Sequence, residues 1–126
     1  MASTPTPIIH SFRAGGTIVK GHAVKIGADA QHVVECTAAT DKAIGIANND
    51  ASTDGAVEVC LPGGGAEGKA QGTIAAGKLV VSHTDGTLKA VATAGDRLVG
   101  FALDTAAAGD LFPVFVVAGQ AYQTES

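Results

Sequence analysis

A repeated pattern constrains the fold of this chain more than any other feature of its sequence. The pattern Gly-Thr-Ile-x-x-Gly begins at Gly16 and again at Gly72, 56 positions later. A second match pairs residues 42–61 with residues 97–116, in which an apolar strand with a central glycine leads through a polar turn and a glycine into another apolar strand. Such long periods are typical of repeated supersecondary units. The sequence therefore predicts two internally repeated β-units.

The composition favours a small all-β domain. A chain of 126 residues fits one domain and can bury roughly two-thirds of the surface of its unfolded state. The 17 glycines disfavour helix interiors and suit tight turns. Since there is no Trp and there are only four Phe and one Tyr, the core must consist mainly of aliphatic residues, and self-association could supply further burial. We expect a Gly-rich β-barrel or sandwich.

The chain divides by composition into an arm, a domain and a tail. Residues 1–13 are expected to form an extended N-terminal arm, because prolines and small polar residues cannot fold alone. A single β domain should follow over residues 14–119, and a C-terminal tail over residues 120–126. The domain is expected to contain a first repeat, a flexible glycine-rich connector and a second repeat, at residues 14–61, 62–71 and 72–117.

Matching positions of the two repeats should have matching structural roles. Ile18 and Ile74 are expected to point into the core, whereas Gly21 and Gly77 should adopt a positive φ in a turn. The Asp-Gly pair within residues 84–86 predicts a β-hairpin.

The last strand of the second repeat contains a proline. Residues 111–117 are apolar on both faces, which predicts a doubly buried strand. Pro113 cannot donate a ladder hydrogen bond, so we expect a sheet edge, a bulge or a covering subunit at this point.

The charge and the termini exclude some classes of partner. The net charge is −4 and the basic residues are scattered, which argues against nucleic-acid binding. The first residues lack the positive n-region and the continuous apolar h-region of a signal peptide, and no apolar run approaches the roughly 20 residues of a membrane helix. We expect a soluble, unexported protein without a membrane partner.

Several motifs suggest chemistry but are incomplete. Residues 63–69 match GxxxxGK, yet Ala70 stands where a phosphate-binding loop needs Ser or Thr, so a plain glycine-rich loop is predicted. The four histidines have no metal-ligand spacing and are expected to face solvent. Cys36 and Cys60 are expected to be small buried thiols; if paired, they would link two strands of the first repeat. No catalytic cluster, metal site or cofactor site is predicted.

Lys42 supports an alternative function. The stretch Thr40-Asp41-Lys42-Ala43 resembles the lipoyl-domain motif, in which a lysine at a hairpin tip carries an acyl cofactor. The acidic flank of that motif is replaced by Ala39, and the second repeat has Arg97 at the matching place. A lipoyl- or biotinyl-like carrier modified on Lys42 is therefore the alternative hypothesis, and a small ligand-binding β-barrel is a third.

A wider pattern of glycines and aliphatic residues carries a family resemblance. The first half contains Ala14-Gly15-Gly16-x-Ile18-x-x-Gly21-x-x-Val24, then Thr40-Asp41-x-x-Ile44-Gly45-Ile46-Ala47, Gly55 and Val57-x-Val59, and residues 72–116 repeat this form. Over roughly residues 12–118 the chain resembles the capsid cement, or head decoration, proteins of tailed bacteriophages.

The resemblance implies a structural virion protein that is not an enzyme and needs no cofactor. It would be made in the host cytoplasm, bind the capsid exterior, commonly as a homotrimer, and clamp neighbouring subunits of the major capsid protein. An extended arm of residues 1–12 reaches at most about 40 Å. We expect it to contact the capsid or an adjacent subunit through its prolines and apolar residues, namely Pro5, Pro7, Ile8, Ile9 and Phe12.

Overall fold

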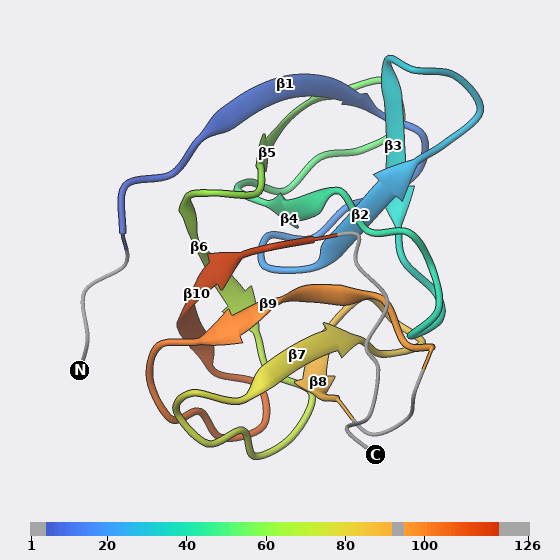
Figure 1. Cartoon of the computed structure of the whole chain (residues 1–126). Coiled ribbons are helices and arrows are strands. Elements are labelled where there is room, and N and C mark those ends of the chain that lie inside the picture. The colour runs from blue at the N-terminus through green and yellow to red at the C-terminus, as the bar shows by residue number, and fades with distance from the viewer. Residues whose placement is uncertain (1–4, 92–94, 119–126) are drawn as a thin grey trace.

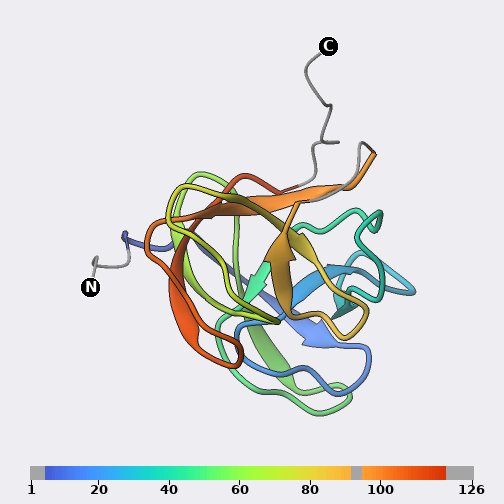
Figure 2. The same ribbon diagram turned by 90° about the horizontal axis from the view of Figure 1, so that it is seen from below.

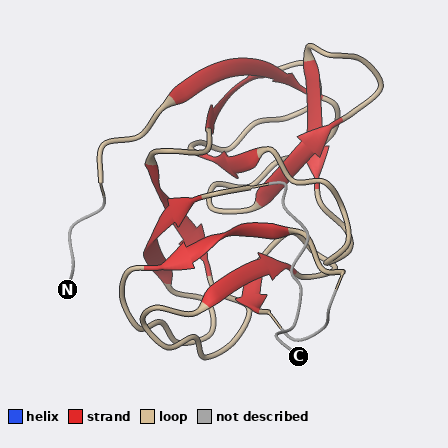
Figure 3. Cartoon of the chain, viewed as in Figure 1, coloured by secondary structure: helices blue, strands red, loops and turns tan. Residues whose placement is uncertain are grey.

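The computed structural model describes residues 5–91 and 95–118, and all regular elements in these ranges are strands, as the sequence predicted (Figure 3). The first unit contains β1 (Ile9–Ala14), β2 (Ala23–Ile26), β3 (His32–Glu35), β4 (Gly45–Ala47) and β5 (Ala56–Cys60). The second unit contains β6 (Gly65–Lys69), β7 (Leu79–Ser82), β8 (Leu88–Ala90), β9 (Leu98–Ala102) and β10 (Leu111–Val116). The units lie one above the other in Figure 1 and overlap when viewed from below (Figure 2). None of the described residues belongs to a helix that could span a membrane.

The first unit is a closed barrel with strand order β1-β3-β2-β4-β5. Strand β1 runs parallel to β3, where Ala14 pairs with Val33, and antiparallel to β5, where Phe12 pairs with Val57. Antiparallel pairs join the remaining strands.

The second unit has the corresponding pairs in an open sheet of order β6-β10-β9-β7-β8. Only an isolated parallel bridge, between Ala70 and Leu88, links its first and third strands. Outside the strands, the bridge between Ile74 and Ala106 corresponds to the bridge between Ile18 and Ala51 in the first unit.

One backbone hydrogen bond distinguishes the closed barrel from the open sheet. In the first unit, the N–H of Arg13 donates to the carbonyl of Gln31 across 2.8 Å. The corresponding groups of the second unit are the N–H of Lys69 and the carbonyl of Gly86, and each of these bonds to the first unit instead.

A loop of the first unit fills this opening. We name residues 21–23 the first insertion loop. Lys69 donates to the carbonyl of Gly21 across 3.0 Å, and Ala23 donates to the carbonyl of Gly86 across 2.8 Å. The second unit is therefore open because the first insertion loop takes the place of a direct bond between β6 and the β7–β8 turn.

Two cores reflect this arrangement. The interior of the first barrel contains small and medium aliphatic side chains, namely Ala14, Ile18, Val24, Val33, Ala47, Val57 and Val59. The second core combines the interior of the second unit with side chains on the outside of the first barrel, namely Ala23, Cys36, Ala43, Ile46 and Cys60. The second core is thus shared by both units, and burial of its apolar surface holds the units together.

Several local predictions are confirmed. Ile18 and Ile74 are both 1% exposed. Gly21 and Gly77 have φ angles of 90° and 87°. The turn between β7 and β8 contains Gly86 at φ 86°, and these strands form the predicted hairpin.

The connector prediction is wrong, because residues 65–69 form strand β6 between the N-terminal segment and β10. Its glycines are required by close packing rather than by flexibility. A Cβ at Gly68 would overlap the Leu88 side chain, and a Cβ at Gly65 would overlap the carbonyl oxygen of Pro5. The predicted arm is also too long, because residues 9–13 belong to β1.

Pro113 occupies a central strand rather than a sheet edge. Strand β10 lies between β6 and β9. Leu103 donates to the carbonyl of Pro113 across 2.9 Å, but proline cannot return this bond, and the β9–β10 pairing ends at Val114 and Ala102. Pro113 therefore lies just beyond the end of the β9–β10 ladder, where the missing N–H of proline costs little stability.

Candidate interaction site

The N-terminal segment lies against the start of the second unit. Gly65 donates to the carbonyl of Thr6 across 3.2 Å, and Leu61 donates to the carbonyl of Ile8 across 2.7 Å. A Cβ at Gly64 would lie 2.6 Å from the backbone nitrogen of Ile8. Residues 5–8 are thus fixed to their own chain by hydrogen bonds and by contacts that only glycine permits.

The five predicted contact residues fall into two groups. Ile8 and Ile9 are 49% and 41% exposed, and Pro7 is also exposed. Pro5 is half-buried over Gly65, and Phe12 is half-buried against the core of the first barrel. The structure therefore leaves Pro7, Ile8 and Ile9 accessible to a partner, while Pro5 and Phe12 make contacts within the chain. Their binding role stays a prediction.

A hollow of about 470 Å³ opens beside the exposed end of β1. Residues from β1, β5 and the β2–β3 loop line it, namely His10, Ser11, Phe12, Arg13, Ala30, Gln31 and Ala56. The rings of His10 and Phe12 meet edge to face with their centroids 4.8 Å apart. We name this feature the first-unit hollow. Sequence patterns gave no sign of it, because its walls come from three separate segments.

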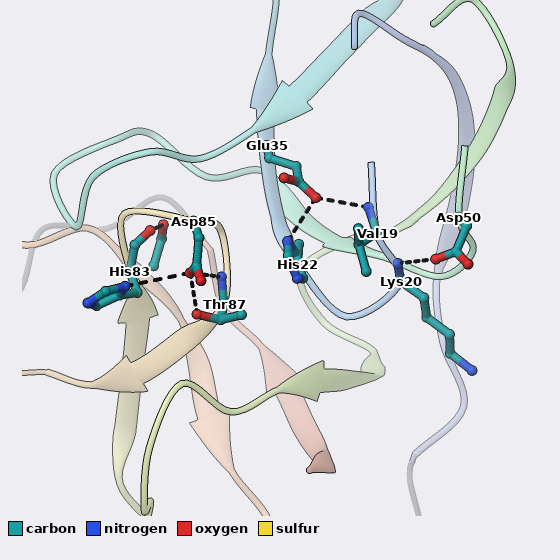
Figure 4. A network of polar contacts seen from close by, with 9 residues as sticks. Val19, Lys20, His22, Glu35, Asp50, His83, Asp85 and Thr87 are labelled. Atoms are coloured by element: carbon teal, nitrogen blue, oxygen red, sulfur yellow. Dashed lines mark hydrogen bonds and ion pairs between the residues drawn. The ribbon is translucent and has the colours of Figure 1, made fainter. Parts of the chain in front are cut away.

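Side chains of the first unit brace the segment that leads into the first insertion loop (Figure 4). Glu35 accepts a hydrogen bond from the N–H of Val19 across 2.8 Å, and Asp50 accepts one from the N–H of Lys20 across 2.7 Å. The Nδ1 atom of His22 lies 2.8 Å from Glu35, at ion-pair distance but without the alignment of a hydrogen bond. These contacts hold the loop in its inserted shape.

The prediction that the histidines face solvent is wrong for His22, which is 9% exposed. It packs against the β7–β8 turn, where a Cβ at Gly86 would lie 3.0 Å from the imidazole Nδ1. In the same turn Asp85 accepts hydrogen bonds from Thr87, which lower the pKa of its carboxyl (Figure 4). A histidine between two units leaves no local pattern in the sequence.

His32 lies between two carboxylates at the surface. Its Nδ1 atom is 2.9 Å from Asp29 and its Nε2 atom is 3.0 Å from Asp54. The hydrogen bond with Asp29 and then that with Asp54 raise the pKa of His32. The hydrogen bond with His32 lowers the pKa of Asp29. Within residues 5–91 and 95–118, no three His, Cys, Asp or Glu side chains group as metal ligands.

Both cysteines are buried and free, as expected for small core thiols. Burial raises the pKa of Cys36 to about 12 and also raises that of Cys60. Because the thiolate is the reactive form, neither thiol is poised for chemistry in the folded protein.

Lys42, the residue of the carrier hypothesis, is exposed in the segment between β3 and β4. The neighbouring Asp41 accepts bonds from Lys25 at 2.9 Å and from the N–H of Thr37 at 2.8 Å. The hypothesis stays a prediction, which the intact mass of the protein from its native source would test by the presence or absence of an acyl-cofactor adduct.

Comparison with known proteins gives a match in structure alone. No protein-family model and no curated protein matches the sequence. Among solved structures, the chain is similar to the crystal structure of the N base of head fiber gp8.5 in bacteriophage phi29, with a TM-score of 0.69 and 17% sequence identity. The similarity covers 91% of this chain and 98% of that chain. The two proteins therefore share a fold over nearly their full lengths.

Proposed function

We propose that this protein is a structural, non-enzymatic component of a phage virion that binds the outside of the head. The observation that carries the proposal is the fold shared with the base of a phage head fiber, over 91% of this chain. The sequence resemblance to head decoration proteins points to the same place in the virion. In this proposal the protein binds neighbouring subunits of the major capsid protein, clamps them together and self-associates as a trimer.

The exposed part of the N-terminal segment is the proposed contact with the head. Pro7, Ile8 and Ile9 present apolar surface beside β1. Pro5 and the hydrogen bonds of Thr6 and Ile8 fix this segment in advance, so little conformational entropy is lost on binding. Many copies on one head would each contribute a modest contact, and multivalency would make the shell cohesive.

Co-sedimentation with heads that lack the protein tests this proposal. The wild-type protein should bind such heads and delay their disruption on heating. The double variant Ile8→Ser/Ile9→Ser should bind about tenfold or more weakly, since two apolar contacts are lost. Ile26→Ser is the matched control, because Ile26 is 43% exposed but lies at the end of β2.

The outcomes separate the parts of the proposal. If the wild-type protein fails to bind heads, head attachment is wrong. If the double variant binds as well as the wild type, the N-terminal segment is not the contact. Bound protein that leaves head stability unchanged would contradict the clamping role.

A further inference from the structure

We propose that two copies of this chain associate head to tail. The contact between the copies would have the same form as the contact within each chain, in which the first insertion loop docks into the second unit. In the contact between copies, residues 77–79 of one copy, named the second insertion loop, dock into the first-unit hollow of another copy. The inference rests on the self-association included in the proposed function and assigns the surfaces that make it.

The contact within the chain supplies the template. The first insertion loop enters the second unit between Lys69, Leu111 and the β7–β8 turn. A Cβ at Gly21 would lie 3.0 Å from the Leu111 side chain and from the Lys69 backbone nitrogen. The backbone bonds of Gly21 and Ala23 to β6 and Gly86 complete the contact.

The first-unit hollow occupies the corresponding place in the other unit. Strand pairing makes Arg13 the counterpart of Lys69, Gln31 the counterpart of Gly86, and Ala56 the counterpart of Leu111. Arg13, Gln31 and Ala56 therefore line a groove in the first unit. It corresponds to the groove that Lys69, Gly86 and Leu111 line in the second unit. In the second unit the first insertion loop fills it, whereas in the first unit it is a hollow of about 470 Å³.

The second insertion loop has the backbone shape of the first. Gly77 donates to the carbonyl of Ala102 across 2.8 Å, as Gly21 does to Ala47 across 2.9 Å. Gly77 and Lys78 are exposed, and no atom lies within 4 Å of a Cβ built at Gly77. The loop that is buried in the first unit is thus presented at the surface in the second.

An apolar row beside each loop supports the same conclusion. In the first unit, Ala23, Ile46 and Cys60 are cross-strand neighbours, and all three are 0% exposed because the second unit covers them. The same register in the second unit contains larger apolar side chains that are only half-buried, namely Leu79, Phe101 and Phe115.

This second row is the face that a partner would cover. The rings of Phe101 and Phe115 lie 5.4 Å apart, so two of the four phenylalanines of the chain meet here. An apolar face on one side of a sheet gains stability when another element covers it. The corresponding row of the first unit is covered by a β-unit of this chain, so a second copy is the occupant that the structure indicates.

Docking requires a small opening of the first barrel. The bond from Arg13 to Gln31 would be replaced by two bonds, from Arg13 to the carbonyl of the partner's Gly77 and from the N–H of the partner's Leu79 to Gln31. The contact is heterologous, so successive copies close into a ring, such as a trimer, or continue as an open stack.

Two single variants and their mixture test the head-to-tail contact. Ala56 is exposed in the hollow, so Ala56→Arg should fill the groove, and Phe101→Gln should weaken the apolar row. Ala107→Arg is the control, because Ala107 is exposed in the turn between β9 and β10. Light scattering over a concentration series would give molar masses, and thermal unfolding would verify that each variant folds.

The wild type and Ala107→Arg should form oligomers, whereas each test variant alone should associate about tenfold or more weakly. An equimolar mixture of Ala56→Arg and Phe101→Gln should form dimers and nothing larger, because one intact groove meets one intact row. If Phe101→Gln fails to fold, the molar mass of Ala56→Arg by itself tests the head-to-tail contact.

A wild type that stays monomeric, an Ala56→Arg variant that associates normally, or a mixture that stays monomeric would overturn the inference. Measuring head binding of the same samples separates the two proposals. A wild type that stays monomeric but still binds heads refutes the head-to-tail contact and the proposed trimer and leaves head attachment standing, whereas oligomers that fail to bind heads refute head attachment alone.

Discussion

Ala23 donates its backbone N–H to the carbonyl of Gly86 across 2.8 Å, and this bond joins the two β-units. Beside it, the imidazole of His22 packs against the backbone of Gly86. The bond explains why the second unit is open where the first is closed, since the first insertion loop occupies the groove that the barrel would otherwise seal.

Gly86→Ala should weaken this junction. The residue has a φ of 86°, and a Cβ would crowd His22 at 3.0 Å. We expect the free energy of unfolding to fall by about 2–3 kcal/mol, of which roughly 1–2 kcal/mol is the cost of a left-handed backbone. Gly109→Ala is the matched control, with a φ of 84° and open space around the Cβ, so only the backbone cost should appear. Equal losses in urea unfolding would show that the contact with His22 contributes nothing.

Gly65→Ala should displace the N-terminal segment. The added methyl group would overlap the carbonyl of Pro5, and relieving this overlap breaks the bond from Gly65 to Thr6. Exchange of the backbone amide hydrogen at position 65 should accelerate about tenfold, and the free energy of unfolding should fall by about 1 kcal/mol. Gly72→Ala, where no atom lies near the Cβ, should change neither quantity. Unchanged exchange in Gly65→Ala would mean that the segment does not depend on this glycine.

The cysteines should be unreactive in the folded protein. With a pKa of about 12, the Cys36 thiol is roughly one ten-thousandth ionised at pH 8, and both side chains are buried. An aromatic disulfide reagent should therefore label neither thiol within minutes in native buffer and both thiols promptly in guanidinium chloride. Rapid labelling of the native protein would contradict the buried, unpaired state, and absence of labelling after unfolding would indicate a disulfide.

His32 should make stability depend on pH. Its pKa is raised in the folded state, so its contribution is fully present below the unfolded pKa, near 6.5, and is lost as the pH rises through the folded value. The pKa of Asp29 is lowered, so its contribution is present above about 3.8 and is lost as the pH falls through the folded value. The pair should stabilise most between these limits.

Thermal midpoints of the wild type and His32→Gln across pH 3–9 would measure this dependence. The difference between the two proteins should be largest near pH 5 and shrink toward both ends of the range. A constant difference would show that the stabilising role of His32 does not depend on its charge.

Sequence reasoning recovered the features that depend on nearby residues. Alternating aliphatic residues, Asp-Gly in the β7–β8 turn and glycines at Gly21 and Gly77 predict strands and turns, because backbone sterics and side-chain periodicity act over a few positions. The same reasoning misread residues 62–71 as a flexible connector, although residues 65–69 form β6. Glycine-rich stretches are usually flexible linkers. Here, however, Gly65 and Gly68 are packed against Pro5 and Leu88, which lie far away along the chain.

The candidate site was predicted only in part. Apolar residues behind a proline-rich start predict a contact segment. Ile8 and Ile9 are exposed, and their contact with a partner stays a prediction. The first-unit hollow and the apolar row of Leu79, Phe101 and Phe115 were not predicted, since each contains residues from several strands. The buried position of His22 was missed for the same reason.

The sequence by itself determined the all-β class and the turn positions, because these follow from local sterics and from the spacing of glycines and aliphatic residues. Only the tertiary structure decided that Gly21 and Ala23 insert between Lys69 and Gly86, and hence that one unit is closed and the other open. The two units have the same local preferences, so the difference arises from a long-range contact. A backbone group forms its hydrogen bond with whichever partner the packing of the whole chain brings near it.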